Sequence, residues 1–372
     1  MNDARPLRPD GLLKDGPLKT GWTTGACATA AAAAAFRALL TGTFPDPVTI
    51  TLPRGETPSF PLARTETGDG WARAGIIKDA GDDPDVTHGA EIIARVRRGG
   101  AGAGVRFEAG AGVGTVTKPG LPIPVGEPAI NPAPRQMMTQ AIAAIAAELG
   151  AAADVIITVS IPGGEKIAEK TMNGRLGIVG GLSILGTTGI VKPYSCSAWI
   201  HAIQSGVDVA LAEGRTHIAG ATGKTSEAAV RTLYDLPEGA LIDMGDFAGG
   251  LLKYVRGHPV PRLTIAGGFG KLSKLAQGHM DLHSARSSVD FDALAGLLDD
   301  LGADAMTCAR IRTANTTAEA LQVAGPLAAK LTRTIAERAA AEARAVAGPK
   351  TEIDVLVIDR AGTVLAHTDG SA

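Results

Sequence analysis

The sequence predicts two domains of different fold class: an α+β domain over residues 1–150, followed by an α/β domain with a doubly wound parallel sheet over residues 151–372. A length of 372 residues with 45% hydrophobic side chains is enough for two cores. In the first part, strand-like and helical patterns do not alternate regularly. From Asp154 onward, continuous apolar runs alternate with helical patterns. This alternation is typical of a parallel sheet covered by helices on both faces.

The first predicted domain begins with a long helix. Thr23 and Thr24 are candidate N-caps, the alanine-rich helix reaches about Leu40, and Gly42 lies beyond its end. The remaining elements follow in chain order: a strand from Val48, a helix near Glu91, a strand from Gly104, an irregular proline-rich segment over 119–135, and a helix over 137–149.

The second predicted domain starts with the apolar strand 154–161. Strand and helix patterns then alternate through residues 197–207, 216–221, 226–236, 241–245 and 263–267. A helix from about Thr317 to Val346 and two short strands close the chain. In such a sheet the ligand crevice lies at the carboxyl ends of the strands. Asp243 ends one of these strands, where an acidic residue commonly binds ribose hydroxyls, although capping of the next helix explains it nearly as well.

Composition excludes several classes of function. A formal net charge of −2 argues against a globally basic nucleic-acid-binding protein, and an aromatic content of 3% argues against stacking platforms for single strands. The three cysteines, Cys27, Cys196 and Cys308, are widely separated, which argues against a disulfide framework. The N-terminus has no secretory signal pattern, and the alanine run is too short and weakly apolar for a membrane span. We therefore expect a cytoplasmic protein without nucleic-acid or membrane partners, and we leave a homo-oligomer open.

The segment from Ser160 to Ser195 is unusually rich in glycine turns between short apolar runs. Glycine costs conformational entropy, so a dense cluster requires either close backbone approach to a ligand or tight packing. Ligand contact is the leading interpretation here. The candidate ligand-binding residues are Gly163, Gly164, Gly186, Thr187, Thr188 and Gly189.

This segment resembles the CbiD-type family, the cobalt-precorrin-5B C1-methyltransferases of cobalamin biosynthesis. Further blocks resemble the same family in the same order: LKTGWTTGACATAAAAAA from Leu18, IIKDAGDDPDVTHG from Ile76, GVGTVTKPGLPIPVGEPAINPAPRQMM from Gly112, GGFGKLSKLAQGHMDLHS from Gly267, and ANTTAEAL from Ala314. The resemblance therefore spans nearly the whole chain. It implies an α+β first domain and a Rossmann-like second domain.

The resemblance also implies a reaction, in which S-adenosylmethionine methylates C1 of cobalt-precorrin-5B to give cobalt-precorrin-6A. The glycine and threonine cluster, together with Asp243, becomes the expected binding site for this co-substrate. The substrate would be an anionic tetrapyrrole. Two alternatives stay open, a non-catalytic tetrapyrrole carrier and a nicotinamide-dependent reductase.

The expected substrate-binding residues include a basic block between Lys253 and Arg286, which holds six Lys and Arg side chains and one acid, Asp281. Carboxylates of a corrin precursor would bind there through charge-assisted hydrogen bonds, although a solvated helix face is the plainer reading. Lys271 and Lys274 are expected on one side of a helix that begins after Gly270. The full expected set is Thr23, Thr24, Lys271, Lys274, His279 and Arg286.

Methyl transfer requires positioning of the two ligands, and a base is expected to take up the proton that the ring releases. His283 and Asp246 are the candidate catalytic residues. His279 and His283 are spaced to share a helical face, but no HExxH motif is present, so no metal site is expected. An acidic loop over residues 79–88 is read as turn capping within a functional loop. GATGKT over 220–225 fails as a phosphate loop because Ile218 stands where the first glycine belongs.

Overall fold

The computed structural model describes residues 17–368, and these form two compact units that divide between Ser195 and Cys196. The boundary expected from the sequence, after residue 150, differs from this division. Strand β10 (Val155–Ser160) pairs with β6 and β7 of the N-terminal sheet. Residues 154–161 therefore belong to the first unit, and they do not open the second sheet as the sequence pattern suggested.

The N-terminal unit contains a five-stranded sheet in the order β4-β5-β6-β10-β7. All neighbouring strands are antiparallel except β10 and β7, which are parallel. The strands are β4 (Arg64–Gly68), β5 (Trp71–Ile77), β6 (Glu91–Arg98) and β7 (Val105–Ala109). The helix expected near Glu91 is therefore wrong, because its apolar side chains pair with strands on both sides.

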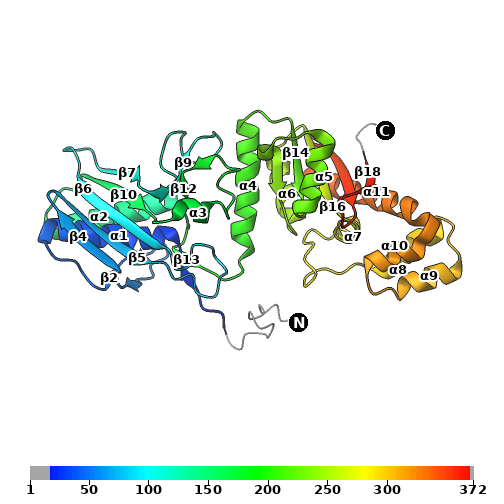
Figure 1. Cartoon of the computed structure of the whole chain (residues 1–372), viewed down its shortest axis with the longest axis horizontal. Coiled ribbons are helices and arrows are strands. Elements are labelled where there is room, and N and C mark those ends of the chain that lie inside the picture. Colours follow the sequence, from blue (N-terminus) through cyan, green and yellow to red (C-terminus); the bar gives the residue numbers. More distant parts are fainter. Residues whose placement is uncertain (1–16, 369–372) are drawn as a thin grey trace. The chain divides into compact units, whose positions relative to one another are not determined.

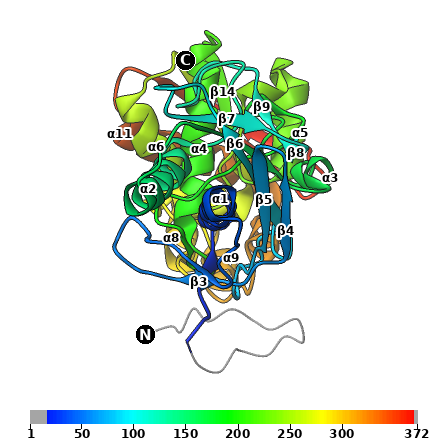
Figure 2. The same ribbon diagram turned by 90° about the vertical axis from the view of Figure 1, so that its left-hand side faces the viewer.

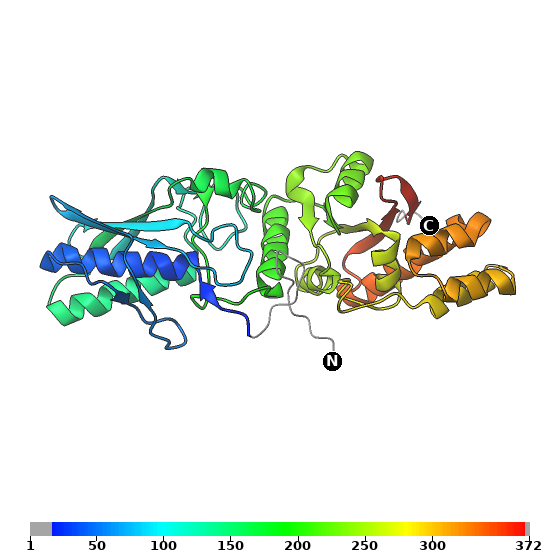
Figure 3. The same cartoon turned by 60° about the horizontal axis from the view of Figure 1, so that its bottom comes forward.

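Helix α1 (Thr24–Thr41) is the centre of the N-terminal core. Thr23 caps it by accepting a hydrogen bond from the Ala26 N–H, and Gly42 ends it at φ 79°, as the sequence predicts. Figure 2 shows α1 between α2 (Pro132–Leu149) and the sheet, and Figure 3 shows the two helices side by side. By length and composition α1 could cross a membrane, but 78% of its apolar window is buried in this unit.

Short paired strands complete the N-terminal unit. They pair as β1 (Gly21–Trp22) with β13 (Ile190–Val191), β2 (Val48–Thr49) with β3 (Ser59–Phe60), β8 (Gly112–Val113) with β12 (Gly181–Leu182), and β9 (Thr115–Val116) with β11 (Ile178–Val179). A short helix, α3 (Gly164–Ala168), follows β10. The expected strand from Val48 is thus only two residues long, because it pairs only with β3.

The C-terminal unit contains a second five-stranded sheet, in the order β15-β14-β16-β17-β18. Strands β14 (His217–Ala221), β15 (Leu241–Asp243), β16 (Arg262–Gly268) and β17 (Glu352–Ile358) are parallel, and β18 (Val364–His367) is antiparallel to β17. The first two strands of this sheet along the chain, β14 and β15, are neighbours, and β16 pairs with the other edge of β14. Connections therefore leave the carboxyl ends of β14 and β16 in opposite directions.

Helices cover both faces of this sheet. On one face Ile218, Leu263 and Val355 join a core with α4 (Cys196–Ala212), α6 (Ala248–Gly257), α7 (Phe269–Ala276) and α11 (Ala328–Ala347). On the other face Ala219 and Leu356 pack with α5 (Lys224–Tyr234). Successive residues of one strand face opposite ways, so each strand must be apolar throughout. This burial explains the continuous apolar runs in the sequence.

Helices α8 (Phe291–Asp300), α9 (Ala305–Arg312) and α10 (Thr317–Ala324) form a group beside the sheet, drawn yellow to orange in Figure 1. The single long helix expected from Thr317 to Val346 is in fact two helices. A 3₁₀ turn over Gly325–Leu327 separates α10 from α11. Pro326 in this turn cannot donate the hydrogen bond that a continuous helix requires.

Candidate functional site

A cavity of about 770 Å³ lies at the carboxyl ends of the parallel strands in the C-terminal unit. Its volume is within the range of small-molecule sites, roughly 300–1,000 Å³. Four segments line it: residues 222–226 after β14, residues 268–271 after β16, residues 316–321 at the start of α10, and the β17–β18 turn with Leu365. The cavity thus lies where connections leave β14 and β16 in opposite directions, which is the usual ligand position in open α/β sheets.

Two helices begin at this cavity with glycine N-caps. Gly223 precedes α5 and Gly268 precedes α7, and neither helix has a side-chain cap. The first N–H groups of a helix have no partner within the helix, and they favour an anionic group of a ligand. The Ser226 hydroxyl donates to the Gly223 carbonyl, which fixes the turn before α5.

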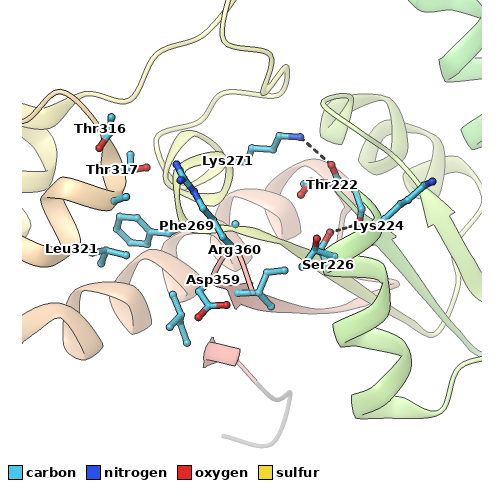
Figure 4. Close-up of a pocket in the computed structure, with 17 residues that line it drawn as sticks. Thr222, Lys224, Ser226, Phe269, Lys271, Thr316, Thr317, Leu321, Asp359 and Arg360 are labelled. Carbon is cyan, nitrogen blue, oxygen red and sulfur yellow. Dashed lines mark hydrogen bonds between the residues drawn. The ribbon is translucent and has the colours of Figure 1, made fainter. Parts of the chain in front are cut away.

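Figure 4 shows side chains from all four segments around the cavity. Phe269, Leu321 and Ile358 supply apolar surface. Arg360 extends from the β17–β18 turn toward the α7 and α10 side, whereas Lys224 points away. Asp359 accepts hydrogen bonds from the Ala361 and Thr363 N–H groups, and these bonds lower the pKa of its carboxyl. The lining therefore combines apolar side chains with the guanidinium of Arg360, which extends toward α7 and α10.

Lys271 connects this cavity to Asp246. Its ammonium nitrogen donates to the Thr222 carbonyl at 3.0 Å and lies 3.0 Å from a carboxylate oxygen of Asp246. Asp246 is in the turn between β15 and α6, and Lys271 is on α7, so the pair joins this turn to the helix that follows β16. The structure thus brings together one expected catalytic residue and one expected substrate-binding residue.

Lys274 does not line the cavity. It is buried, and its ammonium donates to the Leu282 carbonyl at 2.9 Å. Burial lowers the pKa of Lys274, although the nearby Asp246 works against this shift. The expectation that Lys271 and Lys274 project together toward a ligand is therefore wrong in its geometry, because the α7 side that carries Lys274 packs against the following segment.

His279 and His283 do not share a helical face, because α7 ends at Ala276 and both lie in an irregular segment. His283 accepts a hydrogen bond from the Ala285 N–H through Nδ1. Arg286 donates through Nε to Asp281, and this bond raises the pKa of the guanidinium. The Leu282 N–H donates to the Asp246 carbonyl, which holds the segment beside the turn after β15.

Aromatic side chains lie next to Asp246. The Trp199 indole N–H donates to the Asp243 carbonyl at 3.1 Å, and its ring centroid is 6.3 Å from that of Phe247. The Arg286 guanidinium carbon lies 5.7 Å from the Phe247 ring centroid. Asp243, the expected ribose-binding residue, is thus at the carboxyl end of β15 as predicted, and its backbone carbonyl anchors Trp199.

The residues expected around Gly186 are engaged inside the N-terminal unit. The Thr23 N–H donates to the Gly189 carbonyl, and Thr24 exchanges hydrogen bonds with the Leu185 backbone. A side chain at Gly186 would collide with Thr23, and one at Gly189 would lie 2.5 Å from Leu52. Thr188 bonds the backbone of Ile190, and Thr187 is exposed. Packing between chain segments therefore explains both glycines.

Gly163 and Gly164 lie in another part of the N-terminal unit. Gly163 adopts φ 73° before α3, and a Cβ on Gly164 would approach the Gly112 carbonyl oxygen to 2.3 Å. The glycine pair thus allows two backbones to come close. The set expected to bind one co-substrate is consequently divided, with Asp243 in the C-terminal unit and the glycines in the N-terminal unit.

Asp79 and Asp85 cap turns in the acidic loop after β5, as expected, whereas Asp83 binds a distant segment of the N-terminal unit. Asp79 accepts from the Gly81 N–H, Asp83 from Tyr194, and Asp85 from Thr87. Asp85 also pairs at 2.6 Å with the buried ammonium of Lys78. Within residues 17–368, no group of three or more His, Cys, Asp or Glu side chains could hold a metal ion.

Sequence reasoning missed most of the cavity lining. It set aside residues 220–225 because they fail as a phosphate loop, yet this segment is a strand, a glycine turn and a helix at the carboxyl edge. Thr316, the N-cap of α10, lies in the ANTTAEAL block, and the sequence alone predicted no function for the residues of this block. A signal was available, because both strand-to-helix turns at the cavity contain glycine.

The C-terminal unit has the fold of an α/β protein, with a cavity of small-molecule size at the carboxyl ends of its parallel strands. Family comparisons are more specific. The CbiD model matches residues 13–193, and the model for the CbiD C-terminal domain matches residues 281–369. The chain belongs to the CbiD family. The end of the first match lies close to the division between the two units.

Curated relatives match the chain over nearly its full length. The cobalt-precorrin-5B C(1)-methyltransferase of Paramagnetospirillum magneticum is 62% identical over 94% of this chain and 97% of its own. The protein of the same name from Brucella anthropi is 58% identical over 94% and 95%. A crystal structure of the cobalamin biosynthesis protein cbiD from Archaeoglobus fulgidus is 29% identical and covers 69% of this chain and 79% of that one, with a TM-score of 0.39.

Proposed function

We propose that this chain is an S-adenosylmethionine-dependent methyltransferase that methylates C1 of cobalt-precorrin-5B, giving cobalt-precorrin-6A in cobalamin biosynthesis. The observation that carries the proposal is 62% identity to a cobalt-precorrin-5B C(1)-methyltransferase over 97% of that protein's length. The match covers nearly the whole length of the relative, so it includes both units. We further propose that the protein acts in the cytoplasm on this anionic tetrapyrrole.

We propose that the methyl donor binds in the cavity of the C-terminal unit. The strand order and the helices on both faces support a doubly wound, Rossmann-like domain, in which nucleotide-like ligands bind at such a position. Phe269, Leu321 and Ile358 offer apolar surface for the adenine ring. Arg360 and the N–H groups that begin α5 and α7 suit the donor carboxylate.

This assignment replaces the sequence-based co-substrate site. Gly186 and Gly189 are held against Thr23 and Leu52, so we propose that they shape their loop and do not touch the donor. Thr23 and Thr24 have the same structural role, since both are buried and hydrogen-bonded within the N-terminal unit. Gly163 and Gly164 serve backbone packing near Gly112 in the same way.

When bound, the donor supplies a methyl group on a positively charged sulfur, and transfer to carbon requires an in-line approach. The protein must therefore position two ligands and exclude water. We propose that Lys271 holds the Asp246 carboxylate at the cavity edge, where it can accept the proton released as the ring rearranges. His283 remains the second candidate for this role, and His279 and Arg286 remain candidates for substrate contact.

Two measurements test the function. Titration calorimetry of the purified chain with S-adenosylmethionine should give one site per chain, and mass spectrometry should detect one added methyl group on cobalt-precorrin-5B. A protein that binds neither ligand, or that leaves the substrate unmethylated, contradicts the proposal. Binding of the tetrapyrrole without turnover would favour the carrier, and binding of a nicotinamide nucleotide instead of the donor would favour the reductase.

The location of the donor is tested with a blocking variant. Ala318 is exposed on α10 and lines the cavity, so Ala318→Trp should fill the cavity without disturbing the core. Donor affinity should fall at least tenfold. Ala309→Trp is the matched control, because Ala309 is exposed on α9 outside the lining. Equal donor affinity in the two folded variants would mean that the donor binds elsewhere.

A further inference from the structure

An exposed aromatic surface lies beside Asp246, outside the cavity lining. Trp199, in the first turn of α4, is 47% exposed although it is among the largest apolar side chains. Its ring packs on Gly245, about 3.2 Å from the position of a Cβ there, and its indole N–H is fixed on Asp243. Phe247 is partly buried in the core and supports one edge of the indole. The protein thus holds a flat apolar face toward solvent in a defined orientation.

A cation is fixed at the edge of this surface. The Arg286 guanidinium lies over Phe247, and its Nε donates to Asp281. Within the described chain, residues 17–368, no hydrogen-bond partner is found for its two terminal nitrogens. Backbone bonds from Leu282 to Asp246 and from Gly249 to Met280 hold the Arg286 segment against the turn that carries Phe247. The cation and the aromatic face therefore belong to one preorganised surface.

The Asp246–Lys271 ion pair links this surface to the cavity. Asp246 is the residue between Gly245 and Phe247, and its carboxylate lies 3.0 Å from the Lys271 ammonium. Lys271 and its partner Thr222 both line the cavity. The Asp246–Lys271 pair would consequently lie between a ligand on Trp199 and a ligand in the cavity.

We propose that Trp199, supported from behind by Phe247, forms a platform on which one face of the macrocycle packs, while the terminal nitrogens of Arg286 bind one of its carboxylates. The proposal rests on the proposed function and names part of its substrate site. A conjugated macrocycle is flat and apolar over its ring and carries carboxylates at its rim. An indole face suits the ring, and a guanidinium suits the rim.

The test separates macrocycle binding from donor binding. Trp199→Ala should raise the KM for cobalt-precorrin-5B about tenfold, while the Kd for S-adenosylmethionine stays within about twofold. Trp199→Phe should recover part of the loss, because a phenyl ring keeps a flat face. Arg286→Met should raise the same KM and reduce its dependence on salt. Met306→Ala is the matched control, since Met306 is an exposed apolar side chain on α9 of the same unit.

A direct signal is available from Trp199 itself. In a Trp22→Phe, Trp71→Phe background it is the remaining tryptophan, so dicyanocobyrinic acid, a stable corrin with free carboxylates, should quench its fluorescence at saturation. Unchanged KM in Trp199→Ala, or quenching absent while the corrin binds, overturns the platform. Equal loss of donor and macrocycle binding also overturns it, because Trp199 would then only stabilise the unit. Failure of the proposed function would differ, since the parent protein itself would show no turnover.

Discussion

The ammonium nitrogen of Lys271 lies 3.0 Å from a carboxylate oxygen of Asp246, and the same ammonium donates to the Thr222 carbonyl. Lys271 lies on α7, so its two contacts tie the loop after β15 and the loop after β14 to this helix at the carboxyl edge of the sheet. An ammonium at this distance attracts the carboxylate and orients it. The relationship places a candidate base at the border between the cavity and the aromatic platform.

Asp246→Asn should lower kcat by roughly 100-fold or more, because a positioned base contributes about 10²–10⁴ to a rate and the amide cannot accept the proton in its place. Donor affinity should change little, since Asp246 does not line the cavity. Steady-state kinetics and donor calorimetry on the same preparation measure both. His283→Gln is the comparison variant. If it loses the activity and Asp246→Asn keeps it, His283 is the base.

Gly189→Ala should destabilise the N-terminal unit more than Gly163→Ala does. Both glycines adopt positive φ, which costs alanine about 1–2 kcal/mol, but only the side chain at Gly189 meets a neighbour, Leu52 at 2.5 Å. The difference between the two variants therefore isolates the collision. Thermal unfolding of both variants measures it. Equal melting temperatures would contradict the packing role of Gly189. A loss of donor binding confined to folded Gly189→Ala would show that this loop contacts the donor.

Asp354 should make the C-terminal unit sensitive to acid. Burial works to raise the pKa of this fully buried carboxyl, but hydrogen bonds from Tyr234 and Arg262 outweigh burial and lower it. A lowered folded-state pKa gives stability that is present above the ordinary value of about 3.9 and is lost as pH falls through the folded value.

The Asp354→Asn variant tests this. It should lose roughly 3 kcal/mol of unfolding free energy at pH 7, because it removes one partner of a buried ion pair. Its stability should change less than that of the parent between pH 5 and pH 3. Asp299→Asn is the control, since Asp299 is an exposed side chain near the end of α8 in the same unit. Parallel pH profiles of parent and Asp354→Asn would contradict the role of this carboxyl.

The three cysteines should differ in reactivity. Burial raises the pKa of the Cys27 thiol to about 12, so this group is neutral and enclosed in the native protein. Cys308 is also buried, whereas Cys196 is partly exposed. Ellman's reagent at pH 8 should modify Cys196 alone, and the other two thiols should react only after unfolding. Labelling of native Cys196→Ser at the parent's rate would contradict this order.

Local structure could be predicted where a few neighbouring residues decide it. The Thr23 cap, the Gly42 stop and the strands around Ile218 and Leu263 agree with the expected elements. The helix predicted near Glu91 is wrong, since this segment is strand β6. Apolar spacing alone does not distinguish a short helix from a strand with partners on both sides. The units divide after Ser195 because β10 pairs with β6 and β7, and no local pattern specifies that pairing.

The candidate site was predictable only in part. Asp243, Asp246, Lys271 and Arg286 do lie in one region of the C-terminal unit, because all four follow strands or belong to segments at the same edge. Lys274 differs from the expectation, since a charge pattern does not tell which ammonium becomes buried against a carbonyl such as that of Leu282. Trp199 was not singled out at all, because its partners Asp243 and Phe247 are more than 40 residues away in the chain.

By itself, the sequence determined the family, the two ends of α1 and the strands β14, β15 and β16 of the second unit, because these follow from short motifs and from apolar runs that are read locally. Tertiary structure decided which sheet β10 joins, which glycines serve packing, and where the cavity lies. The cavity is built from segments near residues 222, 268, 316 and 358, which meet only when parallel strands align their carboxyl ends. Such alignment depends on long-range strand pairing, and local residue preferences do not encode it.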